Sequence, residues 1–112
     1  TDAAKHDEIV AAISHVPHAA ASALMLAVMD QAGFRRFAAG AGLRDTTRIA
    51  AGEENLWVGI MLANARHTAA GLRDVEKRAA ELRTAVEAND AVALRRLLAE
   101  ARIARQNLDR PE

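Results

Sequence analysis

One residue in four is alanine in this chain, and this excess constrains the fold more than any other feature of the sequence. The 112 residues include 28 alanines and 11 leucines, but only two phenylalanines, one tryptophan and no tyrosine. Alanine and leucine rank highest in helix propensity, whereas the β-branched and aromatic residues that favour strands are sparse. We therefore predict an all-α fold. Small alanine faces also let helices approach closely, which suits a tightly packed or interdigitated bundle.

Composition also excludes several classes of function. The chain lacks cysteine, so it has no disulfide framework, no thiolate zinc site and no cysteine nucleophile. Fifteen basic residues balance fifteen acidic ones, and this neutrality gives no general attraction to nucleic acid or to an anionic membrane. The best apolar run, residues 19–29, is shorter than a membrane span, and the acidic N-terminus is unlike a targeting peptide. We expect a cytoplasmic protein with one domain over residues 1–112.

The first helix is predicted over residues 3–30, where only Pro17 interrupts the helical pattern and either kinks or divides the helix. Its expected buried face follows steps of three and four residues, namely Ile9, Ala12, Ile13, Val16, Ala20, Ala23 and Ala27. Residues 33–52 hold four of the six glycines and are therefore predicted to be rich in turns. Two short helices are expected there, one over residues 34–39 and one from the Asp45-Thr46-Thr47 cap to residue 51.

The third helix is predicted to be long, from residue 53 to residue 88, with a bend at Gly71. Asn89-Asp90 then ends it and caps a last helix that precedes Pro111. A helix of about 50 Å is longer than a compact domain of this size is wide, so its apolar stripe needs another long surface to cover it. A second copy of the chain is the economical cover, and we expect a homodimer with intertwined helices.

Two polar clusters stand out from the apolar helices as candidate binding residues. Ser14 and His18 are four residues apart and hence share a helical face, with His15 beside them and His6 two turns earlier. The alternative is structural, because a helical serine commonly bonds back to a carbonyl and a histidine often lies at a boundary. Acidic ligands at metal spacing are missing near the histidines, so no metal site is predicted.

Arg48 is the second candidate, in a stretch that contains two arginines and two hydroxyls. Its planar guanidinium suits bidentate binding of a carboxylate, while the alternative is a surface ion pair with Asp45. Trp57 fits either a core position or an interface anchor. The charges over residues 73–87, with Asp74/Arg78 and Arg83/Glu87 four apart, are typical of a solvated helix face.

Several motifs are absent from the sequence. It contains no G-x-G-x-x-G, no P-loop and no G-x-S-x-G. The chain therefore offers none of the usual helix-terminus routes for binding a dinucleotide.

Four ordered motifs together resemble one family. They are His6-Asp7, then Ile13-Ser14-His15-Val16-Pro17-His18, then Gly42-Leu43-Arg44-Asp45-Thr46-Thr47-Arg48-Ile49-Ala50, then Leu56-Trp57 with Leu62-Ala63-Asn64. This series resembles the C-terminal helical domain of prephenate or arogenate dehydrogenase, over essentially the whole chain. The resemblance implies an all-α bundle like the C-terminal domain of 6-phosphogluconate dehydrogenase. One departure is Ala41, which interrupts the glycines that often precede the arginine-aspartate pair in the family.

The resemblance implies an oxidoreductase of tyrosine biosynthesis, which converts prephenate to 4-hydroxyphenylpyruvate by oxidative decarboxylation. It places NAD or NADP, and the catalytic histidine, in an N-terminal Rossmann domain that this chain lacks. The isolated chain is then expected to be inactive.

By the same resemblance, Ser14, His18 and Arg48 bind the substrate, with Arg48 holding a carboxylate. Trp57 reaches the partner subunit's site, whereas His6 and Asp45 have supporting roles. The alternative interpretation is a helical dimerisation or ligand-sensing module without catalysis; a metal-binding bundle ranks third.

Overall fold

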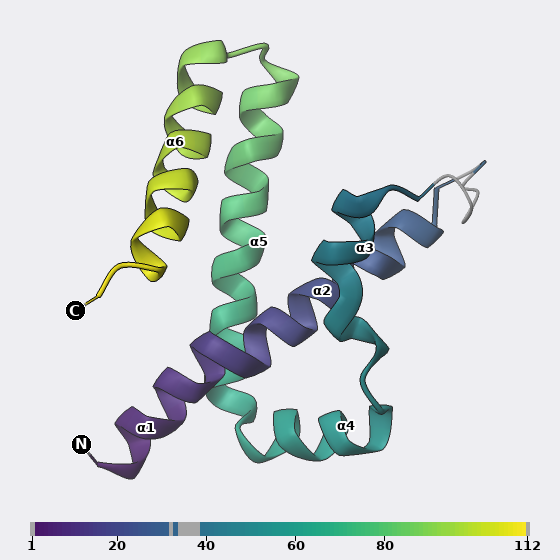
Figure 1. Ribbon diagram of the computed structural model, residues 1–112, viewed down its shortest axis with the longest axis vertical. Coiled ribbons are helices and arrows are strands. Elements are labelled where there is room, and N and C mark those ends of the chain that lie inside the picture. Colours follow the sequence, from purple (N-terminus) through teal and green to yellow (C-terminus); the bar gives the residue numbers. More distant parts are fainter. Residues whose placement is uncertain (1, 32, 34–38, 112) are drawn as a thin grey trace. The chain divides into compact units, whose positions relative to one another are not determined.

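Helices account for the regular structure of this chain, as its alanine content predicts. The computed structural model describes residues 2–31, 33 and 39–111, and these contain no strand (Figure 1). In order, the elements are α1 (Ala3–Val10), the π-helical segment η1 (Ala11–His15), α2 (Val16–Met29), α3 (Ala41–Thr47), the 3-10 helix η3 (Arg48–Ala51), α4 (Glu54–Ala63), α5 (Ala65–Glu87) and α6 (Ala91–Leu108). The short helix predicted over residues 34–39 falls on a segment that, except for residue 39, lies outside the described residues.

The chain divides into two compact units, residues 1–75 and residues 76–112. The first unit contains α1 to α4 and the start of α5. The second contains the rest of α5 and all of α6. The candidate binding residues all belong to the first unit.

The first helix runs without a break from α1 through η1 to α2. The Asp2 carboxylate caps it by accepting a hydrogen bond from the Lys5 amide at 2.8 Å. Pro17 has no N–H to donate, and the turn just before it widens so that the Val16 amide donates to the Ala11 carbonyl. A π turn thus accommodates the proline, and Pro17 does not divide the helix.

The same helix corrects the expectation that no apolar segment reaches membrane-spanning length. It is 27 residues long, and an 18-residue window within it has a mean hydropathy of 1.6. Residues 9–29 contain no Asp, Glu, Lys or Arg, and the unbroken helix joins them into one segment. In this window 28% of the residues are buried, and they include the central histidines, which lie against Trp57 of α4.

The buried face of this helix agrees with the predicted one at Val16 and differs from it elsewhere. Ile13 is 73% exposed, whereas Ala11, His15 and His18 are buried. The π turn inserts an extra residue into the helical repeat and so rotates the residues after it relative to those before it. Alanines on all sides also leave the apolar face poorly defined in the sequence.

The long third helix is in fact two helices with a break at Asn64. That residue leaves helical geometry at φ −128° and ψ 40°, so α4 ends there and α5 begins. The start of α4 agrees with the prediction, because the Glu53 carboxylate accepts hydrogen bonds from the Asn55 and Leu56 amides. These backbone bonds, that from Leu56 foremost, lower the pKa of Glu53 below its ordinary value.

Gly71 lies inside α5, where it permits a close approach between helices. A Cβ atom at this position would lie 2.4 Å from Cγ2 of Val16, which is buried in α2. The predicted bend of the helix is therefore replaced by the break at Asn64, and the glycine serves the packing of α2 on α5.

The turn-rich middle also differs from its prediction. Gly40 precedes α3, and Asp45, Thr46 and Thr47 lie within that helix instead of capping the next one. Both threonine hydroxyls donate to carbonyls four residues earlier, those of Gly42 and Leu43. The bonds end α3 where the tighter η3 begins.

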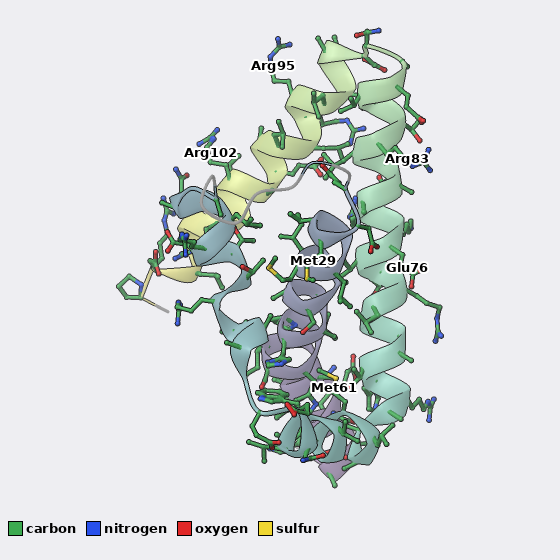
Figure 2. The ribbon with its side chains drawn as sticks, turned by 90° about the vertical axis from the view of Figure 1, so that its right-hand side faces the viewer. Met29, Met61, Glu76, Arg83, Arg95 and Arg102 are labelled. Carbon is green, nitrogen blue, oxygen red and sulfur yellow. The ribbon has the colours of Figure 1, made fainter. Side chains whose placement is uncertain are left out.

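In the second unit, α6 follows α5 through the predicted turn. Asn89 adopts a positive φ of 52°, and the Asp90 carboxylate caps α6 by accepting from the Ala93 amide at 3.0 Å. Arg83 pairs with Glu87 at 2.8 Å, as predicted. Arg78 pairs with Glu81 instead of Asp74. Figure 2 shows the labelled Arg83, Arg95 and Arg102 on the outer sides of this hairpin.

Replacing Gly71 with alanine should destabilise the first unit, because Val16 is β-branched, buried and unable to move aside freely. We expect Gly71→Ala to lower the free energy of unfolding by about 1–3 kcal/mol. The double variant Gly71→Ala/Val16→Ala should recover part of the loss. Thermal unfolding followed by circular dichroism measures both.

Gly59→Ala is the matched control, since a Cβ there meets nothing within 4 Å and alanine favours the helix. Equal stability of Gly71→Ala and Gly59→Ala would contradict the close packing of Val16 on Gly71.

Candidate functional site

Two aromatic rings from separate helices stack at the centre of the first unit. The His18 ring of α2 lies on the Trp57 indole of α4, with centroids 3.8 Å apart and an angle of 15° between the planes. His15 approaches the same indole edge-on, with centroids 6.5 Å apart and an angle of 78°. His15 and His18 are 8% and 5% exposed, while Trp57 is half-buried. The indole thus keeps an accessible part beside two fixed imidazoles.

Gly52 makes this stack possible. A Cβ atom at Gly52 would lie 2.8 Å from the Trp57 Nε1 and 2.9 Å from the His18 Cε1. The glycine backbone is extended, at φ −61° and ψ 154°, so the requirement is space for the two rings and not an unusual conformation. The sequence showed Gly52 only as one of several turn glycines.

Ser14 does not share the buried position of His18. The predicted four-residue spacing assumed an α-helical turn, and the π turn instead buries His15 together with His18. Ser14 is half-buried. The serine that bonds back to the helix is Ser22, whose hydroxyl donates to the His18 carbonyl at 3.0 Å. The expected bond from a helical serine to a carbonyl of its own helix is therefore found at Ser22.

Asn64, at the break between α4 and α5, contacts the first helix at two points. Its side-chain Nδ2 lies 2.8 Å from the Asp7 carbonyl oxygen and 3.3 Å from the His15 Nδ1. The two contacts connect the end of α4 to both α1 and η1. Sequence reasoning missed Asn64 as a site residue, although it lies in one of the four family motifs.

Arg48 begins η3, which packs against α2 and leads within four residues to Gly52. The Arg48 side chain is exposed. The packing of η3 on α2 holds this segment next to the helix that carries His18. Within the described residues Arg48 forms no ion pair with Asp45, so the surface-pair alternative is not observed.

The two supporting candidates lie on the surface. His6 is exposed on α1 with its Nδ1 3.5 Å from an Asp7 carboxylate oxygen, and Asp45 is exposed on α3. No group of three or more His, Asp or Glu side chains within the described ranges could hold a metal ion. The stacked rings and the segment of Arg48 therefore form the candidate site, as a surface with apolar, hydrogen-bonding and cationic parts.

Residues 2–100 match the family model described as "Prephenate dehydrogenase, dimerization domain". Among curated proteins, the prephenate dehydrogenase of Lactococcus lactis subsp. cremoris is 30% identical over 96% of this chain and 31% of its own length. The cyclohexadienyl dehydrogenase of Zymomonas mobilis is 37% identical over 76% of this chain. The chain spans about 30% of the length of the curated relatives that it matches.

Solved structures show the same likeness in three dimensions. The arogenate dehydrogenase of Synechocystis aligns with a TM-score of 0.90 and 27% identity, over 96% of this chain and 41% of that one. The prephenate dehydrogenase from A. aeolicus, in complex with hydroxyphenyl propionate and NAD+, aligns with a TM-score of 0.84 and 28% identity. It covers 97% of this chain and 39% of that one. These alignments agree with the predicted helical architecture.

Filling the space at Gly52 should separate the stacked rings. In Gly52→Ala we expect Trp57 to move off His18 toward solvent, because neither ring can pass the new methyl group. The only tryptophan in the chain reports the change, and its emission maximum should shift to the red. Gly59→Ala, which adds a methyl group in open space on the same helix as Trp57, should leave the emission unchanged. An unshifted spectrum for Gly52→Ala would contradict the close packing at the site.

Proposed function

The chain belongs to the prephenate dehydrogenase dimerization-domain family, and from this premise we propose that it is the dimerising and substrate-binding part of a prephenate or arogenate dehydrogenase. The full-length enzyme, which we expect in the cytoplasm, would act in tyrosine biosynthesis and oxidise its substrate with NAD or NADP. The hydride loss would be coupled to decarboxylation and aromatisation of the ring. The proposal includes both substrates because relatives are named for each of them.

The single observation that carries the substrate-binding proposal is the His18–Trp57 stack beside the segment of Arg48. A flat aromatic surface beside a segment that carries an arginine suits a ligand that combines a six-membered ring with carboxylates. Prephenate carries two carboxylates, and a neutral chain needs dedicated cationic donors for such a dianion. The A. aeolicus neighbour is in complex with hydroxyphenyl propionate, a ring that bears a carboxylate chain.

Each candidate residue has a defined task in this proposal. Arg48 holds one substrate carboxylate through two parallel N–H···O bonds. His18 donates a hydrogen bond, Ser14 supplies a hydroxyl, and the Trp57 indole covers one side of the ligand. His6 and Asp45 act at the margin of the site. A reach of Trp57 toward the partner's site stays part of the proposal, in addition to its stack on His18 of the same chain.

Dinucleotide binding is assigned to a region outside this chain. The described residues contain no strand, and so they lack the strand–turn–helix cradle that commonly holds a pyrophosphate. The described residues therefore do not have the features of a main binding site for NAD or NADP. We infer that a Rossmann domain elsewhere in the protein supplies it, together with the catalytic histidine.

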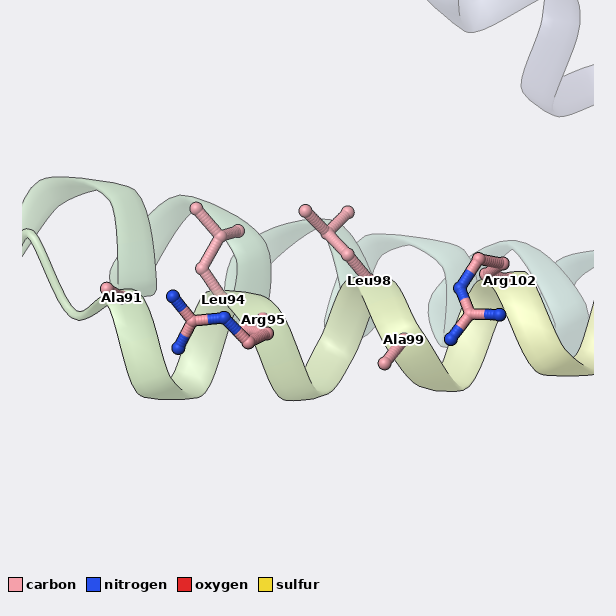
Figure 3. Close-up of a pocket in the computed structure, with 6 residues that line it drawn as sticks. All are labelled: Ala91, Leu94, Arg95, Leu98, Ala99 and Arg102. Atoms are coloured by element: carbon pink, nitrogen blue, oxygen red, sulfur yellow. The ribbon is translucent and has the colours of Figure 1, made fainter.

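Exposed apolar side chains support the proposed homodimer. Ile13 is 73% exposed, Val92 73% and Leu108 75%. On α6 alone, an open hollow of about 480 Å³ is lined by Leu94, Leu98 and the stems of two arginines (Figure 3). Large apolar surfaces of this kind mark protein–protein contacts. The matching family model is itself that of a dimerization domain.

The chain should sediment as a dimer at micromolar concentration, at about twice its mass of 12.0 kDa. Leu98→Glu places a charge in the hollow of α6 and should shift the equilibrium toward monomer. Asn107→Glu adds the same charge at an exposed position about two and a half turns further along α6, on the opposite face of the helix, and should leave the dimer intact. A monomer at micromolar concentration would contradict the proposed assembly.

Removing the Arg48 guanidinium should weaken substrate binding in the full-length enzyme. A charge-assisted pair contributes about 1.5–3 kcal/mol, so Arg48→Ala should raise KM roughly ten- to a hundredfold. The value of kcat should change little if the clamp grips substrate and transition state equally. Arg48→Lys should rescue poorly because an ammonium cannot bind bidentately. Steady-state kinetics with prephenate and NAD(P)+ measures all three.

Arg44→Ala is the matched control, since Arg44 is an exposed arginine of the same segment whose Nε donates to the Ala39 carbonyl. Unchanged kinetics of Arg48→Ala would contradict the clamp. If the unmodified full-length protein dimerises but does not turn over prephenate or arogenate, the module without catalysis becomes the better interpretation.

A further inference from the structure

The two contacts of the Asn64 amide determine where the proton of His15 lies. A backbone carbonyl oxygen only accepts hydrogen bonds, so the Asn64 atom 2.8 Å from the Asp7 oxygen must be the amide nitrogen. The same nitrogen lies 3.3 Å from the His15 Nδ1 and has a second hydrogen to donate. Nδ1 is therefore the acceptor, and the proton of the neutral His15 ring resides on Nε2.

The His15 ring, whose tautomer this contact sets, borders the Trp57 indole. His15 is 8% exposed and meets the indole edge-on, while His18 covers the indole face. Two imidazoles thus hold Trp57 from perpendicular directions. Gly52 leaves room for the stacked pair, because a Cβ there would lie 2.9 Å from the His18 Cε1 and 2.8 Å from the Trp57 Nε1.

We propose that Asn64 is a positioning residue, which holds His15 in the Nε2–H tautomer and thereby keeps the Trp57 indole seated on His18. Asn64 can do so because the break between α4 and α5 places its side chain over the π turn that carries His15. The bond to the Asp7 carbonyl orients the amide, and the bond to Nδ1 orients the ring. The consequence for substrate binding rests on the proposed function of the Trp57 surface.

Nitrogen chemical shifts of the imidazole rings test the tautomer directly. The chain is labelled with 15N-histidine, studied in alkaline buffer where imidazoles are neutral, and assigned with a His15→Gln variant. We expect His15 to show a protonated Nε2 and an unprotonated Nδ1. In Asn64→Asp the side chain can only accept, so the proton should move to Nδ1. Asn55→Asp makes the same amide-to-acid change at an exposed position of α4 and should leave His15 unaltered.

A protonated Nδ1 in the unmodified chain, or a His15 tautomer that is the same in Asn64→Asp, would overturn the proposal. Trp57 emission provides a second readout on the same samples. It should shift to the red in Asn64→Asp and not in Asn55→Asp.

Kinetics of the full-length enzyme separate this proposal from the proposed function. Asn64→Asp should raise KM for prephenate about three- to tenfold, the effect of one neutral hydrogen bond, and leave kcat within about twofold. An unchanged KM despite a switched tautomer would overturn the link from Asn64 to the binding surface. If the unmodified enzyme fails to turn over prephenate, the proposed function fails, and the shifts and the emission alone decide the role of Asn64.

Discussion

The close packing of α2 on α5, where Val16 lies against Gly71, is the contact on which the first unit depends. A methyl group added at Gly71 would lie 2.4 Å from Cγ2 of Val16, so the valine side chain packs directly on the glycine of α5. The residue before Val16 is His15, and the start of α5 carries Asn64 on its N-terminal side. The same pair of helices thus also carries the contact between the imidazole and the amide, which lie 3.3 Å apart. The fold and the candidate site share one contact.

Much of the secondary structure could be predicted because its determinants are local. Alanine and leucine indicate helices, and the caps at Glu53 and Asp90 arise from carboxylates that accept backbone amides. The break at Asn64 could not be predicted in this way. Its geometry is stabilised by hydrogen bonds to Asp7 and His15, more than forty residues earlier in the chain, and no spacing rule reports such partners. Helix propensity alone favours continuing through that position.

The site was predicted in part for a related reason. The family motifs indicated His18, Arg48 and Trp57 as candidates, and the rings of His18 and Trp57 stack on each other. Periodicity then paired Ser14 with His18, because it assumed 3.6 residues per turn throughout. The π turn before Pro17 changes that register and buries His15 instead. Proline was recognised as a disturbance of the helix, but a proline can be accommodated by a kink, a break or a wider turn, and the choice depends on tertiary packing.

The buried core of the described residues is small and partly polar, and this connects the site to the proposed assembly. The buried side chains include His15, His18 and Thr68, whose hydroxyl has no hydrogen-bond partner among the described residues. Large apolar side chains such as Ile13 and Leu108 are instead mostly exposed. The buried apolar residues are the small Ala11, Val16, Ala21 and Ala85, and so small an apolar core gains little from the hydrophobic effect. In the proposed homodimer a second copy would cover part of this exposed apolar surface, so the arrangement of the polar rings and the association of the subunits are expected to be energetically linked.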